Sequence, residues 1–338
     1  MTVKLPIASK PHITSECWTC YKFAIMQTSP FYTDWLMSHM ELVTYSNGRC
    51  IFGYNEYIYP LSYYNEILDI SDGNLLNVPP ERIVAYLKEQ IDRKKYVIID
   101  LNFNRVYSDK VSDLDIHETL IYGYNDENAE FYSLLISARG AEEGRLSFYA
   151  IQKAYADAYN YYKNHKPYYH IRRDFFFGIT LISLKPSYEN SNKKYDFYKK
   201  IHRTLGKEIY KQSSGITKEL ECEYTVGIYR YRYVIKMIKA LLKGEHDESE
   251  TYKTILKIYE YHTLCLLAFE AIVYDNNELL NRYTEYVEKL LIFVQMFLKY
   301  RFTHDNNILK RILKDLKHLE NEEADLVLAC RRAVQSKF

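Results

Sequence analysis

Cys17 and His117 are the residues whose types and predicted positions best fit nucleophilic chemistry. Cys17 lies at the start of a segment, residues 16–26, whose apolar residues have helical spacing, with Thr14 or Ser15 as the expected cap. The positive end of a helix dipole favours a thiolate in the first turn, and the thiolate is the nucleophilic form of cysteine. His117 follows a polar loop and opens an apolar strand, where its ring can face a cleft and act as a base. The two together make a predicted Cys–His nucleophilic site.

Other interpretations of these residues are weighed against this one. A lone cysteine in a helix is most often a small core residue, and a lone histidine is most often structural. Cys20 is a rival nucleophile one turn further along the same face, where the dipole effect has faded. The C-x-x-C spacing is also that of thioredoxin-like redox sites, but no predicted strand precedes it. A zinc site would need two more ligands at regular spacing, and the sequence shows none.

The bulk composition sets the class of protein. The chain has 338 residues, with 45 Lys and Arg against 44 Asp and Glu, so a nearly neutral charge removes the electrostatic argument for nucleic acid or anionic membrane. Residues 1–10 hold no apolar run of signal-peptide length, and the most apolar stretch, residues 290–298, is too short to span a bilayer. The six cysteines are too scattered for a disulfide framework. We expect a reduced, cytoplasmic protein that binds neither nucleic acid nor membrane.

Alternating and helical patterns divide the chain into two parts. The first part mixes predicted helices at 80–94 and 145–164 with predicted strands at 96–101, 117–124, 131–136 and 175–184. From about residue 195 the pattern is helical almost throughout, in segments near 195–212, 216–243, 249–274, 276–300 and 305–335. The composition changes near 187–194. We therefore predict an α+β domain with an antiparallel sheet over 1–190 and a helical domain over 191–338 that covers or extends the cleft.

Four short motifs between about residues 10 and 185 resemble a known family when taken in order. Residues 17–26 (CWTCYKFAIM) resemble the nucleophile helix of papain-like, peptidase C39-like enzymes. Residues 47–54 (NGRCIFGY) resemble the glycine-aromatic segment of the butirosin-biosynthesis H-type acyltransferases within that group. Residues 96–106 (YVIIDLNFNRV) and 117–126 (HETLIYGYND) are similar to their aspartate strand and histidine strand. The resemblance implies a papain-like fold for the first domain.

The resemblance also implies an activity and a set of roles. Its members move an acyl group from a carrier-protein thioester to an amine through an acyl-cysteine, with no cofactor or metal. Cys17 would be the nucleophile and His117 the general base and then the acid. The partners would be an acyl or peptidyl carrier protein and a small amine, in the biosynthesis of an antibiotic or nonribosomal peptide. A cysteine peptidase or amide hydrolase is the first alternative, and an inactive papain-like scaffold is the second.

The sequence departs from the family pattern at two places. No glutamine stands just before Cys17 to complete an oxyanion hole, so the Cys17 backbone N–H is expected to contribute, with Thr14, Ser15 or His12. The usual carboxylate or amide after the histidine strand is not evident. Asp100, at the end of the preceding strand, is the expected orienting residue, with Asn102 and Ser133 as alternatives. We expect His117 within about 3–4 Å of Cys17 and in contact with Asp100.

Overall fold

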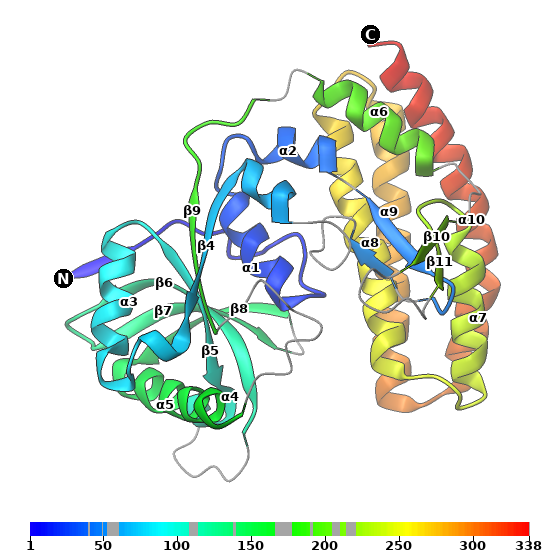
Figure 1. The fold of residues 1–338 in the computed structure, drawn as a ribbon. Helices are drawn as coiled ribbons and strands as arrows, with labels where there is room; N and C mark the ends of the chain where they lie inside the picture. The colour runs from blue at the N-terminus through cyan, green and yellow to red at the C-terminus, as the bar shows by residue number, and fades with distance from the viewer. Residues whose placement is uncertain are drawn as a thin grey trace. The chain divides into compact units, whose positions relative to one another are not determined.

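The computed structural model describes residues 1–39, 41–48, 50–52, 61–107, 114–137, 140–165, 178–189, 192–204, 210–213 and 221–337. The chain divides into two compact units, the first formed by Met1–Tyr32 and Pro60–Tyr188 and the second by Thr33–Tyr59 and Glu189–Phe338 (Figure 1). The division near residue 190 lies close to the predicted one. Residues 33–59, which the prediction counted with the first domain, belong to the second unit.

The first unit is built on an antiparallel sheet in the order β4-β9-β5-β6-β7-β8, with β1 paired to β6. Strands Tyr96–Asn102 (β5) and Ile116–Asn125 (β6) form its centre. The other strands are Thr2–Lys4 (β1), Leu68–Asn74 (β4), Glu130–Ser137 (β7), Gly140–Ser147 (β8) and Gly178–Leu184 (β9). Every described pair in this sheet is antiparallel, so the predicted sheet type is confirmed.

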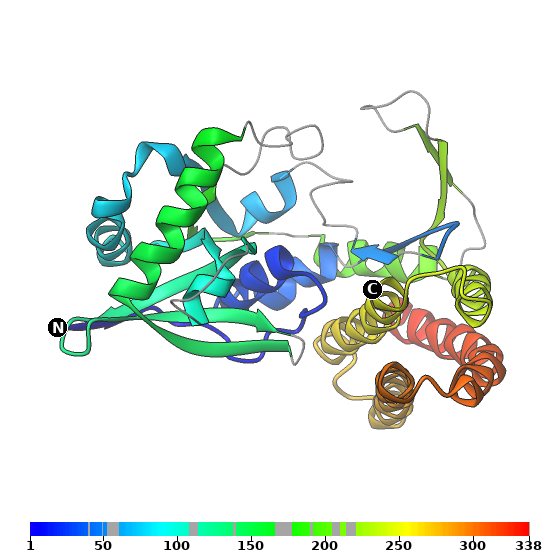
Figure 2. The ribbon, with the colours of Figure 1, turned by 90° about the horizontal axis from the view of Figure 1, so that it is seen from below.

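Two helices of the first unit lie on the same side of this sheet. Ile83–Asp92 (α3) packs against β5 and β6, and Phe148–Asn164 (α5) packs against β5 and β8 (Figure 2). Val97, Ile99 and Leu101 alternate along β5 and share one buried core with residues of both helices. Every residue of β5 is buried, and its continuous apolar run is why this strand could be predicted. Cys17–Met26 (α1) contacts β6, and Phe103–Tyr107 (α4) follows β5 directly. Three short 3₁₀ turns complete the unit, at Leu61–Glu66 (η1), Leu75–Asn77 (η2) and Pro80–Arg82 (η3).

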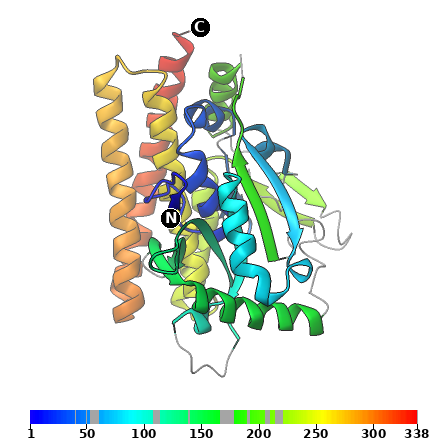
Figure 3. The same cartoon turned by 90° about the vertical axis from the view of Figure 1, so that its left-hand side faces the viewer.

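Long helices make up most of the second unit. Asn277–Thr303 (α9) packs against both Glu248–Glu270 (α8) and Asn306–Gln335 (α10), and Arg230–Leu242 (α7) packs against α10 (Figure 3). Helices Tyr32–His39 (α2), all but its first residue, and Lys193–Thr204 (α6) belong to the same unit. The predicted α+β class with a mostly helical C-terminal part is confirmed. Among the described residues, no helix is both long and apolar enough to cross a membrane.

The second unit also holds a small sheet that the helical pattern did not predict. Its order is β10-β11-β2-β3, from strands Tyr210–Ser213, Glu221–Thr225, Leu42–Tyr45 and Cys50–Phe52. Two predicted helices, 195–212 and 216–243, were therefore too long, because each includes one of these strands. β11 pairs with β10 on one side and with β2 on the other, and local spacing cannot reveal a partner as far away in the sequence as β2. Residues 145–147, predicted as helical, are instead the end of β8.

Candidate active site

Cys17 is the first residue of α1, the position expected for a dipole-assisted nucleophile. Glu16, rather than Thr14 or Ser15, holds the cap position, in an extended conformation and without a side-chain capping bond. The first helical bond runs from the Cys20 N–H to the Glu16 carbonyl at 2.8 Å. The N–H groups of the preceding residues in the first turn have no partner within the helix itself, and they give this end its partial positive charge.

The structure brings Cys17 and His117 together from positions a hundred residues apart. Cys17 Sγ lies 3.9 Å from His117 Nε2, within the predicted range. Cys17 is half-buried, and the His117 side chain is 42 % exposed, so both groups are accessible from solvent. His117 is held by the pairing of β6 with β5, in register with Leu101, and by the ring of Phe103, whose centroid lies 5.6 Å away. The geometry is that of a thiol with an imidazole in position to exchange its proton.

A carboxylate completes the arrangement. Glu118 Oε2 lies 3.2 Å from His117 Nδ1, and its side chain is 11 % exposed. The order thiol, imidazole, carboxylate is the order of groups in a Cys–His–acid triad, in which the acid fixes the ring orientation and tautomer. Hydrogen bonding to Cys17 and then to Glu118 outweighs burial and raises the pKa of His117 to about 10. The imidazolium form that this favours stabilises negative charge on the adjacent sulfur.

No protein-family model matches this chain, and no curated protein matches its sequence. What the site can do is therefore inferred from its geometry.

The expected orienting residues lie elsewhere, and Glu118 takes the position predicted for Asp100. Asp100 is buried at 3 % exposure and accepts a 2.5 Å hydrogen bond from the Tyr162 hydroxyl. Asn102 donates to Asp157 Oδ2 at 2.9 Å and accepts from the Asp115 N–H. Ser133 pairs in register with Ile121, further along β6 than His117. The carboxylate at Nδ1 is thus the chain neighbour of the histidine, which the sequence analysis did not consider.

Tyr21 ties the helix of the thiol to the strand of the imidazole. Its hydroxyl donates a 2.8 Å hydrogen bond to the Glu118 carbonyl, and its side chain is fully buried. Tyr21 lies one turn beyond Cys17 on α1, so this bond fixes α1 against the start of β6. A buried hydrogen bond of this kind helps to position the start of α1, with Cys17, beside the start of β6, with His117.

The oxyanion-hole candidates differ in how they are used. His12 Nδ1 is hydrogen-bonded to the Tyr32 hydroxyl at 2.9 Å, and the His12 backbone N–H donates a hydrogen bond to Gln27 Oε1 at 2.8 Å. Its Nδ1 and its backbone N–H are therefore already hydrogen-bonded within the protein. Burial also lowers the pKa of the His12 imidazole. The Cys17 backbone N–H remains the donor best placed by the helix start, as a first-turn amide next to the nucleophilic sulfur.

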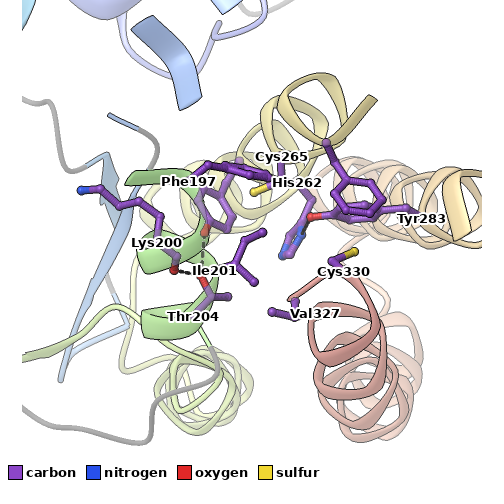
Figure 4. A pocket seen from close by; sticks show the side chains of 11 residues that line it. Phe197, Lys200, Ile201, Thr204, His262, Cys265, Tyr283, Val327 and Cys330 are labelled. Carbon is purple, nitrogen blue, oxygen red and sulfur yellow. Dashed lines mark hydrogen bonds between the residues drawn. The ribbon is translucent and has the colours of Figure 1, made fainter. Parts of the chain in front are cut away.

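The other described thiols are poor nucleophiles. Cys20, the rival of Cys17, is completely buried. Cys265 and Cys330 line a cavity of about 20 Å³ among α6, α8, α9 and α10 (Figure 4), which is room for about one water molecule. Burial raises the pKa of Cys265 to about 12 and that of Cys330 further still. Buried thiols of this kind are inert. Cys17, which is half-buried, is therefore the candidate for the reactive cysteine.

Glu118→Gln is expected to slow acylation of Cys17 by a thioester on the order of 10²-fold, because glutamine can hold the wrong tautomer of His117. The matched variant Asp100→Asn should leave the rate within a few-fold. The measurement is the rate of adduct formation by intact-protein mass spectrometry, with circular dichroism as a check of folding. A larger loss in Asp100→Asn than in Glu118→Gln would return the orienting role to Asp100.

Proposed function

We propose that this protein is a cysteine-dependent acyltransferase that moves an acyl group from a carrier-protein thioester to an amine through an acyl-Cys17 intermediate. The observation that carries the proposal is the 3.9 Å approach of Cys17 Sγ to His117 Nε2, with Glu118 at Nδ1. Its proposed setting is natural-product biosynthesis in the cytoplasm, where free thiols persist. Free thiols are present at Cys17, Cys20, Cys50, Cys265 and Cys330, which agrees with such a setting.

The geometry supports a two-step reaction in which His117 gives up one proton in the first step and regains one in the second. The Cys17 thiolate attacks the thioester carbonyl, and the oxyanion is stabilised by the first-turn N–H of Cys17. The carrier thiolate leaves and takes a proton from the His117 imidazolium. An amine then attacks the acyl-cysteine and gives a proton to His117, and the Cys17 thiolate leaves. The products are an amide and a carrier thiol, and the Cys–His pair has regained its proton.

Transfer and hydrolysis share this intermediate, so the Cys–His–Glu group alone does not separate them. Transfer is favoured here by the likeness of residues 47–54 and 117–126 to the acyltransferase motifs. A second unit as large as the first is also more protein than a simple hydrolase needs. The outcome depends on whether water or the amine reaches the acyl-cysteine first.

A single-turnover assay tests the proposal. The probes are acyl thioesters of N-acetylcysteamine, which carry the thioester of a carrier arm, with a panel of small primary amines. Amide product should exceed free acid for at least one amine, and Cys17→Ala should give neither. Free acid that equals or exceeds amide for every amine, together with cleavage of peptides, would identify a peptidase or amide hydrolase. An intact, folded protein that forms no Cys17 adduct would identify a scaffold.

A further inference from the structure

The three side chains of the candidate active site are also three of the ligand types that zinc prefers. A thiolate, an imidazole and a carboxylate are the sulfur, nitrogen and oxygen ligands of protein zinc sites. In the described part of the chain, Cys17, His117 and Glu118 are the one group of three such residues whose ligand atoms all lie within 4.8 Å of one another. This group arises only in the fold, because the sequence separates Cys17 from the other two by a hundred residues.

The distances suit a single ion. Zinc bonds of about 2.3 Å to sulfur and 2.0–2.1 Å to nitrogen or oxygen, in a tetrahedral site, place neighbouring ligand atoms about 3.3–3.6 Å apart. Cys17 Sγ lies 3.9 Å from His117 Nε2, close to this value, whereas the 3.2 Å contact of Glu118 Oε2 is to the other ring nitrogen, Nδ1, and an ion can use only one of the two nitrogens. One ligand atom of each of the three residues lies within 4.8 Å of the others, so an ion bound through one ring nitrogen requires the three side chains to draw closer together.

Charge and access favour the same ion. A thiolate and a carboxylate together carry two negative charges, which neutralise a divalent cation, and the imidazole adds a neutral ligand. The 42 % exposure of the His117 side chain provides an entry path and leaves the fourth position to water. Three protein ligands with an open fourth position make an accessible site, whereas structural zinc sites are closed by four ligands.

We propose that Cys17, His117 and Glu118 bind one Zn²⁺ ion, which holds the nucleophile in a reversible inactive form. Binding releases the one proton that the Cys–His pair shares to solvent, and Zn²⁺ takes its place between thiolate, neutral imidazole and carboxylate. The thiolate is then bonded to the metal and is withdrawn from attack on a thioester. This proposal does not depend on whether the acyl acceptor is an amine or water.

Zinc binding to tag-free protein, measured by competition with a chromophoric chelator, tests the site. Wild-type protein should bind one tight Zn²⁺ per chain. Cys17→Ser, His117→Ala and Glu118→Gln should each weaken binding by more than roughly 10-fold, the smallest loss typical of even an outer-shell partner. Cys20→Ser is the matched control on the same helix and should leave affinity unchanged. Circular dichroism verifies that each variant is folded.

Two further readouts place the ion on the sulfur. Co²⁺ should give a thiolate-to-metal charge-transfer band that Cys17→Ser removes, and Zn²⁺ should protect Cys17 from iodoacetamide until a chelator is added. Equal zinc affinity in wild type and Cys17→Ser, or a loss below 10-fold in Glu118→Gln, would overturn the three-ligand site. Acylation of Cys17 in chelator-treated protein is measured separately, so failure of the zinc site and failure of the acyltransferase proposal give different results.

Discussion

Cys17→Ala is expected to abolish the acyl adduct and to lower thioester turnover on the order of 10⁴-fold or more, the scale of loss when a catalytic nucleophile is removed. The physical reason is that no other described thiol can replace it. Cys17 is half-buried at a helix start and 3.9 Å from an imidazole, whereas Cys20 is completely buried. Intact-protein mass spectrometry after incubation with an N-acetylcysteamine thioester measures the adduct directly.

Cys20→Ala is the matched control for this prediction. It removes a thiol one turn along the same helix and should leave the adduct on Cys17 intact. Because Cys20 is a core residue, the control should also lose some stability, and the assay is run where both variants are folded. An adduct that persists in Cys17→Ala, or one that Cys20→Ala alone removes, would assign the chemistry to Cys20 and contradict the proposed mechanism.

The pairing of Cys17 with His117 could be predicted because each signal is local. A cysteine at a helix start and a histidine at a strand start are both visible in the sequence, and β5 and β6 have apolar patterns strong enough to locate them. What joins them is the packing of α1 against β6, including the bond from Tyr21 to the Glu118 carbonyl. The spacing of residues in the sequence does not reveal that α1 and β6 are in contact.

The third residue of the site could not be predicted by the same reasoning. Alternation along a strand places neighbouring residues on opposite faces, which argues against Glu118 as the partner of His117. The strand begins only at Ile116, and at its start the Glu118 carboxylate reaches His117 Nδ1 across 3.2 Å. Asp100 has a regular position within a strand, and its carboxylate is instead bonded to Tyr162. Only the folded structure shows which of these two carboxylates contacts the His117 ring.

The same limit applies to the small sheet of the second unit. The four residues of β10 and the five of β11 have no apolar run, and β11 joins the rest of the sheet by pairing with β2, more than 150 residues away. The long helices α8, α9 and α10 could be predicted because their apolar residues recur at three- and four-residue spacing over many turns. Long periodic elements are thus visible from local sequence, and short elements held by distant partners are not.

Glu323→Ala is expected to destabilise the helical unit by about 3–5 kcal/mol, the cost of leaving a buried charge without its partner. Glu323 and Arg230 are both fully buried, and Arg230 Nη2 lies 3.4 Å from Glu323 Oε1. The other carboxylate oxygen accepts hydrogen bonds from the Tyr231 hydroxyl at 2.7 Å and the Tyr286 hydroxyl at 3.0 Å, and lies 3.3 Å from His262 Nε2. Removing the carboxylate therefore deprives the buried Arg230 guanidinium, two tyrosine hydroxyls and the His262 ring of a shared partner.

The adjacent residue provides a matched control for this loss. Glu322 pairs with Lys289 on the surface, with side chains 37 % and 47 % exposed, and pairs of this kind contribute about 0–1 kcal/mol. Glu322→Ala removes the same charge from the same helix and should change the urea midpoint little. Equal midpoints for Glu322→Ala and Glu323→Ala would show that the buried ion pair contributes no more than the exposed one.

The pH dependence of stability gives an independent measure of the same group. Burial raises the pKa of the Glu323 carboxyl, but the Arg230 guanidinium, His262 and the Tyr231 hydroxyl outweigh burial and hold this pKa well below its usual range. A carboxyl with a lower pKa in the folded state stabilises the fold fully above its unfolded pKa of about 4.3 and loses that contribution as the pH falls. Wild-type protein should therefore lose stability in acid more steeply than Glu323→Gln, measured as urea midpoints between about pH 3 and pH 7. Parallel profiles for the two proteins would mean that Glu323 is not charged in the folded state, and the ion pair with Arg230 would then not be the source of the stability of the helical unit.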